Sequence, residues 1–156
     1  MKWFLVLVSL ACACTEPLDD RPMTLAYVAE AILAPNCGTA TCHSTWKHAQ
    51  GDVFDTVAGA LHTFQQPIFA QPSYPASLLS CYGSDGVTLL DPCMTDDADQ
   101  VNAYSTFLYH VLVDRDIDGG DRMPLDQPLA TKNIEFIAAW IDAGAPGYTS
   151  TLVPAQ

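Results

Sequence analysis

Apolar residues recur at helical spacing in two stretches, one near each end of the chain. In the first, positions 25, 28, 29 and 32 are apolar and follow Thr24, a residue type that caps helix starts, and Pro35 predicts the end of this helix. In the second, positions 134, 137, 138 and 141 form one apolar face that begins near Thr131 and ends before Gly144. These are the two strongest helices that the pattern predicts.

The stretch between these helices is irregular. Glutamine, proline, glycine and serine gather at 65–67, 71–75 and 83–86, which is typical of turns and loops. We expect only short helices there, at 53–64, 75–81 and 98–113. The pattern therefore predicts a small all-α domain in which a long irregular insertion separates the first helix from the last.

The first residues are typical of an export signal. Lys2 is followed by an apolar run too short to span a membrane and then by small residues, the pattern of a secretory signal peptide over 1–13. A cysteine at the cleavage point resembles the lipobox of bacterial lipoproteins, in which that cysteine becomes the lipidated N-terminus. The resemblance favours Cys14, with Cys12 as the alternative, and implies the periplasmic face of an outer membrane. The other interpretation is plain export to the periplasm or beyond.

Lipidation of Cys14 also fits the cysteine count. The chain has six cysteines, and Cys12 would leave with the signal peptide. Cys81 and Cys93 are expected to form a disulfide, as cysteines of exported proteins commonly do. Residues 14–22 would then be the lipid anchor and a polar tether, followed by one domain over 23–150.

The charge of the chain limits its partners. The sequence has six basic and 18 acidic residues, and removal of 1–13 takes away one lysine, which leaves five against 18, a net charge of −13. An acidic surface repels phosphates, which disfavours nucleic acid as a partner. It favours contact with a basic patch on another protein. No other segment of the sequence is long or apolar enough to cross a bilayer, so we expect membrane attachment through the N-terminal lipid only.

Two cysteines are followed at once by a histidine, in Cys37, Cys42 and His43. The sequence C-x-x-C-H attaches c-type haem, and here the gap between the cysteines is four residues instead of two. Two neighbouring thiols can add to the two vinyl groups of haem, and the adjacent imidazole then becomes a ligand of the iron. The alternative is a small Cys37–Cys42 disulfide loop with an incidental histidine.

Met123 is the candidate for a second iron ligand. It precedes Pro124 on a predicted loop, and a methionine thioether paired with histidine raises the reduction potential of haem iron. His110, on a predicted helix, is the rival for that position, although a packed or hydrogen-bonded histidine is its ordinary interpretation. Trp46 and Trp140 are candidate walls of a haem pocket, and Trp140 could equally be a core residue of the last helix.

Together these motifs resemble class I cytochromes c, and in pattern most closely the Planctomycete-type cytochrome c domains and similar haem lipoproteins. The resemblance covers about residues 24–147. Its most specific part is Met123-Pro124 with the ending Trp-Ile-Asp-Ala-Gly-Ala over 140–145. The segments that carry it are 37–43, 72–79, 107–112, 122–124 and 139–145.

The resemblance implies a small cytochrome c-like helical domain with covalent haem c. Cys37 and Cys42 would hold the vinyl groups, His43 would be the proximal ligand of the iron and Met123 the distal one. The implied function is that of a periplasmic mono-haem electron carrier with redox proteins as partners and no enzymatic activity. The chain departs from the family in its four-residue gap and in the 80 positions between His43 and Met123.

Two other interpretations belong to different classes. One is a haem-free lipoprotein of the same fold, held by disulfides, with a binding or structural role. The other is a haem domain that serves a dehydrogenase or peroxidase partner.

Two further kinds of site are disfavoured by the sequence. Residues 114–119 begin like a calcium-binding EF-hand loop, but position twelve is Leu125 instead of glutamate, so we favour an acidic surface turn over calcium. No serine lies in a G-x-S-x-G context that would favour a hydrolase.

Overall fold

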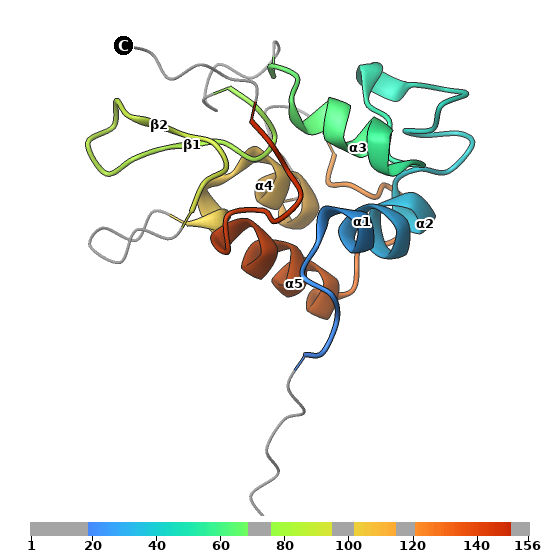
Figure 1. The fold of residues 1–156 in the computed structure, drawn as a ribbon. Helices are drawn as coiled ribbons and strands as arrows, with labels where there is room; N and C mark the ends of the chain where they lie inside the picture. The colour runs from blue at the N-terminus through green and yellow to red at the C-terminus, as the bar shows by residue number, and fades with distance from the viewer. Residues whose placement is uncertain (1–18, 69–75, 95–101, 115–120, 151–156) are drawn as a thin grey trace, which may run out of the picture.

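A computed structural model describes residues 19–68, 76–94, 102–114 and 121–150, and Figure 1 shows how its elements are arranged. The described part is mostly helical, with one small two-stranded sheet. Its longest helix is α5 (Thr131–Asp142), which packs against α4 (Phe107–Val113). None of the helices in these ranges is long and apolar enough to cross a membrane.

The first helix runs from Leu25 to Asn36 in three consecutive segments, which are α1 (Leu25–Tyr27), the π-helical η1 (Val28–Leu33) and α2 (Ala34–Asn36). The cap is confirmed, because the Thr24 hydroxyl accepts a hydrogen bond of 3.2 Å from the Tyr27 amide. The helix ends at Asn36, directly before Cys37 as predicted, although Pro35 itself lies inside α2. The wider π-helical turn before it relieves the clash between a proline ring and the carbonyl four residues earlier.

The middle of the chain differs from its predicted helices in two places. α3 (Val57–Phe64) lies within the predicted 53–64 and begins at a Thr56 cap. The helix predicted at 75–81 is absent from the described residues, where 76–80 form turns. Cys81–Tyr82 instead form strand β1, which pairs antiparallel with β2 (Leu89–Leu90).

The helix predicted at 98–113 is shorter and is preceded by a separate turn. A 3-10 turn, η3 (Ala103–Ser105), comes first, and α4 begins only after Thr106. The Thr106 hydroxyl accepts a hydrogen bond from the Tyr109 amide, so it caps α4 and fixes its start. Residues 98–101 lie outside the described ranges.

The core lies where the first helix, α3 and α5 meet. Trp140 is fully buried at its centre, and its indole N–H donates to the Pro146 carbonyl at 3.2 Å. Gly144 has a positive φ of 83°, so it ends α5 as predicted and turns the chain back over the core. The other large apolar side chains that are fully buried are Phe64, Ile32, Leu33, Leu79, Leu112, Ile137, Ile141 and Val28.

The predicted Cys81–Cys93 disulfide is confirmed and closes the β1–β2 hairpin at its base, with Cα atoms 5.3 Å apart. Next to it, the Asp91 carboxylate accepts hydrogen bonds from Ser77 (3.1 Å) and from Tyr148 (2.8 Å). Burial, followed by the bond to Asp91, raises the pKa of the Tyr148 hydroxyl. The hairpin is therefore held by a covalent bond at its base and by a polar cluster that reaches the C-terminal segment.

Candidate functional site

The loop between Cys37 and His43 is a closed turn that follows α2 directly. The Cys37 amide donates to the Leu33 carbonyl at 2.6 Å, so the end of the helix places this cysteine. The His43 amide donates to the Cys37 carbonyl at 3.0 Å, and the Cys42 amide donates to Thr39 at 2.9 Å. These backbone bonds bring the first cysteine and the histidine together across the four-residue gap.

Both cysteines of this loop are free thiols in the structure. Cys37 is buried and Cys42 is half-buried. Burial, with a further contribution from the nearby Cys42, raises the pKa of the Cys37 thiol to about 12. A thiol that stays protonated at neutral pH is a poor nucleophile, so this environment argues against Cys37 as a catalytic cysteine.

His43 is held with one ring nitrogen engaged. Its side chain is 11% exposed, and Nδ1 lies 2.9 Å from the Ala49 carbonyl oxygen. A carbonyl only accepts, so Nδ1 carries the proton and Nε2 is left with its lone pair. Histidines that bind metals use this arrangement, in which the outer hydrogen bond fixes the tautomer and the direction of the ring.

Asp52 and Phe54 complete the surroundings of the His43 ring. The Asp52 carboxylate lies 3.9 Å from Nδ1, and the Phe54 ring packs edge-on with its centroid 5.6 Å away. Burial raises the pKa of the Asp52 carboxyl, and only a protonated His43 ring would oppose that rise. The histidine thus lies between an acidic group and an apolar ring.

Gly38, the first residue of the gap, is packed against backbone. A Cβ atom on Gly38 would lie 2.6 Å from the Asp55 nitrogen and 2.8 Å from the Phe54 carbonyl carbon, which is too close for any side chain. The Phe54 amide donates to the His43 carbonyl at 2.6 Å. Asp55 in turn accepts from the Thr45 amide and hydroxyl, which lowers its pKa. The loop and the segment before α3 therefore form one tightly fitted unit.

The two candidate tryptophans lie in opposite environments. Trp46 is 89% exposed, so the structure does not place its indole against His43. Trp140 is in the core and joins His43 through a row of rings, with centroid separations of 5.6 Å from His43 to Phe54, 5.8 Å to Phe64 and 5.9 Å to Trp140. Trp140 thus supports the loop from two rings away.

The two candidates for the sixth ligand of an iron lie in the same neighbourhood of the fold. Met123 is half-buried, and its amide donates to the Val111 carbonyl of α4 at 2.7 Å. His110 is the preceding residue of α4, and its Nδ1 lies 2.6 Å from the Asp114 carboxylate. His110 is therefore a hydrogen-bonded histidine, as its ordinary interpretation predicted, whereas the backbone bond holds the chain at Met123.

Two surface hollows lie away from this loop. One of about 410 Å³ lies between α4 and α5 and includes Tyr109 and Arg122 in its lining, and one of about 230 Å³ includes Arg21 and Phe136. Neither is lined by the Cys37–His43 loop. The described ranges hold no cluster of three or more His, Cys, Asp or Glu side chains suited to a metal ion. Haem iron, in contrast, takes only one or two ligands from the protein.

Several predicted features lie outside the described residues. They are the signal peptide, Cys12 and Cys14, the segment 72–75 of the family resemblance, and 115–120 of the acidic turn. Within the described residues, His48 and His62 are exposed.

Sequence reasoning missed Ala49, Asp52 and Phe54, the residues that surround the His43 ring. A backbone carbonyl has no sequence signature, and the short apolar and acidic stretch over 52–55 resembles many loop ends. Only the fold of the loop brings them to His43. Comparisons of the chain with models of protein families, with curated proteins and with solved structures found no match.

Proposed function

We propose that this chain is an exported, lipid-anchored c-type cytochrome that carries one electron on a single covalently bound haem. The observation that carries the proposal is the state of His43, whose Nδ1 is bonded to the Ala49 carbonyl and whose Nε2 lone pair is free. A histidine that directly follows two free thiols, and is held in this way, has the donor set of a haem attachment site.

The residues of the loop fit this cofactor chemically. Cys37 and Cys42 would each form a thioether to a vinyl group, and Nε2 of His43 would bind the iron. Haem supplies an iron that takes up and releases one electron. Phe54 fixes the His43 ring edge-on, and the Ala49 carbonyl keeps the proton on Nδ1.

Met123 is the proposed second axial ligand, because its thioether lies on a segment held to α4 by the Val111 carbonyl. A histidine and methionine pair would favour the reduced iron and raise its potential. With both axial positions filled, the protein has no open site for a substrate, so it would act as a carrier and not as an enzyme. Its acidic surface favours a redox partner with a basic contact patch.

The test of covalent haem is expression of the full-length chain in a host with cytochrome c maturation machinery, followed by haem-stained denaturing gels and intact mass. We expect a haem band that survives denaturation, one added haem in the mass and no free thiol at Cys37 or Cys42. The matched control is the Cys81→Ala/Cys93→Ala variant, which removes two cysteines of the other pair and should still carry haem if it folds. The Cys37→Ala/Cys42→Ala variant should carry none.

An apoprotein with a Cys37–Cys42 disulfide, made where a control cytochrome matures normally, would contradict the proposal. It would favour the alternative of a haem-free, disulfide-stapled lipoprotein with a binding or structural role.

The second ligand is tested by substitution of two methionines. Met123→Ala should abolish the sulfur-to-iron absorption band of the oxidised protein and lower the potential. Met94→Ala, which removes a 49% exposed methionine, should change neither. Loss of the spectral signature in a His110→Ala variant instead would assign His110 as the ligand.

A further inference from the structure

The segment expected to be a loose tether ends in a tight docking contact. Arg21 Nε and Nη2 both donate to the Asp19 carboxylate, at 2.8 and 2.5 Å for the shortest contacts. Nη1 donates to the Asn133 side chain at 2.8 Å, and Nη2 donates to the Lys132 carbonyl at 2.9 Å. The guanidinium carbon lies 4.2 Å from the centre of the Phe136 ring.

This arrangement uses properties that only arginine has. A planar guanidinium can donate to several acceptors at once while its face stacks on an aromatic ring, which a lysine ammonium cannot do. The Arg21 side chain is 21% exposed, so much of its surface is covered in the hollow beside α5. Two backbone hydrogen bonds hold the residues after Arg21, since the Thr24 amide donates to the Pro22 carbonyl and the Leu25 amide donates to the Pro146 carbonyl. Residues 19–25 are therefore part of the folded domain.

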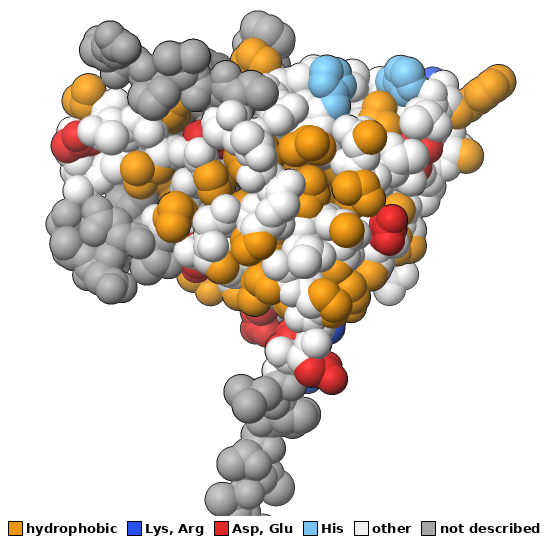
Figure 2. All heavy atoms as spheres, viewed as in Figure 1, with side chains coloured by type: hydrophobic (Ala, Val, Ile, Leu, Met, Phe, Trp, Pro, Cys, Tyr) orange, Lys and Arg blue, Asp and Glu red, His pale blue; other side chains and the backbone are white. Residues whose placement is uncertain are grey.

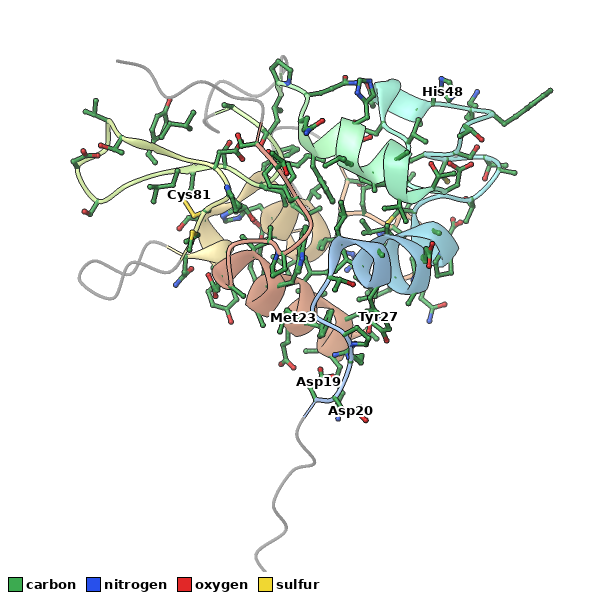
Figure 3. All side chains as sticks on the ribbon, viewed as in Figure 1. Asp19, Asp20, Met23, Tyr27, His48 and Cys81 are labelled. Carbon is green, nitrogen blue, oxygen red and sulfur yellow. A yellow bond between two sulfur atoms is a disulfide. The ribbon has the colours of Figure 1, made fainter. Side chains whose placement is uncertain are left out.

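The docked segment lies at the opposite end of the molecule from the candidate haem loop. Figure 3 labels Asp19 and Asp20 at the lower end, where the chain leaves the domain, and His48 at the upper end. A separation seen in projection is a real separation in space. His48 lies close to His43, because the His48 amide donates to the carbonyl of Ser44, the residue that follows His43.

We propose that Arg21 fixes how the domain stands on a membrane, with the start of α5 facing the lipid and the Cys37–His43 loop facing away. The proposal rests on the lipid attachment at Cys14 that is part of the proposed function. Between Cys14 and Asp19 there are five Cα-to-Cα steps, which reach at most about 18 Å at 3.6 Å each. A domain of this size has a radius of gyration of about 14 Å, so it cannot turn over freely on so short a tether.

The charges where residues 19–21 meet the start of α5 favour a domain that stays outside the lipid bilayer over one that inserts into it. Asp19, Asp20 and Glu135 lie there beside the cations Arg21 and Lys132, which leaves three negative against two positive charges. Figure 2 shows acidic side chains next to basic ones where the chain leaves the domain. Acidic groups are repelled by anionic lipid headgroups. The acyl chains on Cys14 would therefore hold the protein at the membrane, while the acidic groups at this end keep the folded domain away from the lipid headgroups.

The test uses the full-length lipidated protein in nanodiscs that contain a gadolinium-chelating lipid, observed by NMR. We expect stronger broadening of the amide signals of Lys132 and Asn133 than of His48. Arg21→Ala should remove that difference, and Arg21→Lys, which keeps the charge but not the fork of donors, should reduce it. Arg122→Ala is the matched control for loss of one positive charge, and it should leave the difference intact.

The outcomes separate the fixed orientation of the domain from the lipid attachment at Cys14. Equal broadening at both ends, in a protein whose mass shows lipid on Cys14, would overturn the fixed orientation. Absence of lipid from Cys14 would overturn the membrane contact and the lipoprotein part of the proposed function, whatever the state of the haem. Relaxation of the soluble Cys14→Ser protein tests the clamp alone, since residues 19–22 should be as rigid as α5 and should become mobile in Arg21→Ala.

Discussion

The chain contains two cysteine pairs that the fold treats in opposite ways. Cys81 and Cys93 are joined and close a hairpin, while Cys37 and Cys42 remain free thiols in a turn held by backbone hydrogen bonds. The hairpin gains further support from the half-buried Asp91 carboxylate, which accepts hydrogen bonds from Ser77 and Tyr148. The turn at Cys37 instead holds two free thiols, and one ring nitrogen of His43 keeps its lone pair.

The difference shows how crosslinked and free cysteines are stabilised by different means in one chain. A disulfide stabilises by restricting the unfolded chain, and it needs no other ligand. The turn is stabilised by its own backbone bonds and by the ring row that leads from His43 to Trp140. It therefore keeps its shape with the thiols free, which is what later attachment of a cofactor requires.

The largest effect is expected at Trp140, which supports the loop from the core. Trp140→Ala should lower the free energy of unfolding by about 3–5 kcal/mol, because it removes a fully buried aromatic side chain and leaves a cavity. Trp46→Ala is the matched control, and it should change the stability by less than about 0.5 kcal/mol, since that ring is 89% exposed. Urea unfolding measures both, and a large loss in Trp46→Ala would show that the loop packs in another way.

The next effect separates the two cysteine pairs directly. Cys81→Ala/Cys93→Ala should cost about 2–4 kcal/mol of stability, because the closed loop of the unfolded chain is released. Cys37→Ala/Cys42→Ala in the apoprotein should cost less, since no crosslink is lost. Denaturant unfolding with and without reductant provides the measurement, and equal losses from both pairs would contradict the contrast.

A third prediction uses the titration of the free pair. The pKa of the Cys37 thiol is raised from 9.0 to about 12, so the folded apoprotein holds this proton after the unfolded chain has lost it. Its contribution to stability is intact below pH 9 and is lost as the pH rises toward 12, at about 1.4 kcal/mol per pH unit.

The pH dependence is measured as a difference between variants, because the buried Tyr148 hydroxyl also has a raised pKa and acts in the same direction. The Cys37→Ala variant should lose less stability than the wild-type apoprotein between pH 9 and 12. Haem attachment should remove the same dependence, since a thioether does not titrate. An identical pH dependence of stability in the wild type and in Cys37→Ala would contradict the raised pKa of the Cys37 thiol.

The smallest effect concerns the acidic group beside His43. In the haem-loaded protein, Asp52→Asn should raise the midpoint potential, because a carboxylate 3.9 Å from Nδ1 stabilises the more positive, oxidised iron centre. The shift should be below about 60 mV, a tenfold change in equilibrium for one electron. Asp55→Asn is the control, since its carboxylate is bonded to Thr45, and potentiometry that shows equal shifts would remove the special role of Asp52.

Much of the fold could be predicted from local signals. Thr24 and Gly144 are residues whose chemistry caps or ends a helix, and the structure uses them so. The Cys81–Cys93 disulfide followed from the count of cysteines in a chain that its sequence predicts to be exported. Pro35 marked the end of the first helix to within one residue, but the π-helical turn that accommodates its ring was not predicted, because such a turn depends on packing that the local sequence does not show.

The candidate site was predictable only in part. The adjacency of Cys37, Cys42 and His43 is written in the sequence, and the structure keeps them in one closed turn. The residues that hold the His43 ring could not be predicted, because Ala49 contributes only a backbone carbonyl and Asp52 comes near His43 only through the fold of the loop. The interior place of Trp140 was foreseen as one of two options, and the structure shows the side chain fully buried in the core.

Gly38 limits which sequences can form this loop. Since any side chain there would collide with the backbone at Asp55, the four positions between the cysteines are not equally free to vary during evolution. Divergent members of a lineage with this loop should retain Cys-Gly-x-x-x-Cys-His, while Thr41 and the other gap residues drift. A pattern of that form, joined to a downstream Met-Pro, would identify other chains that share this loop.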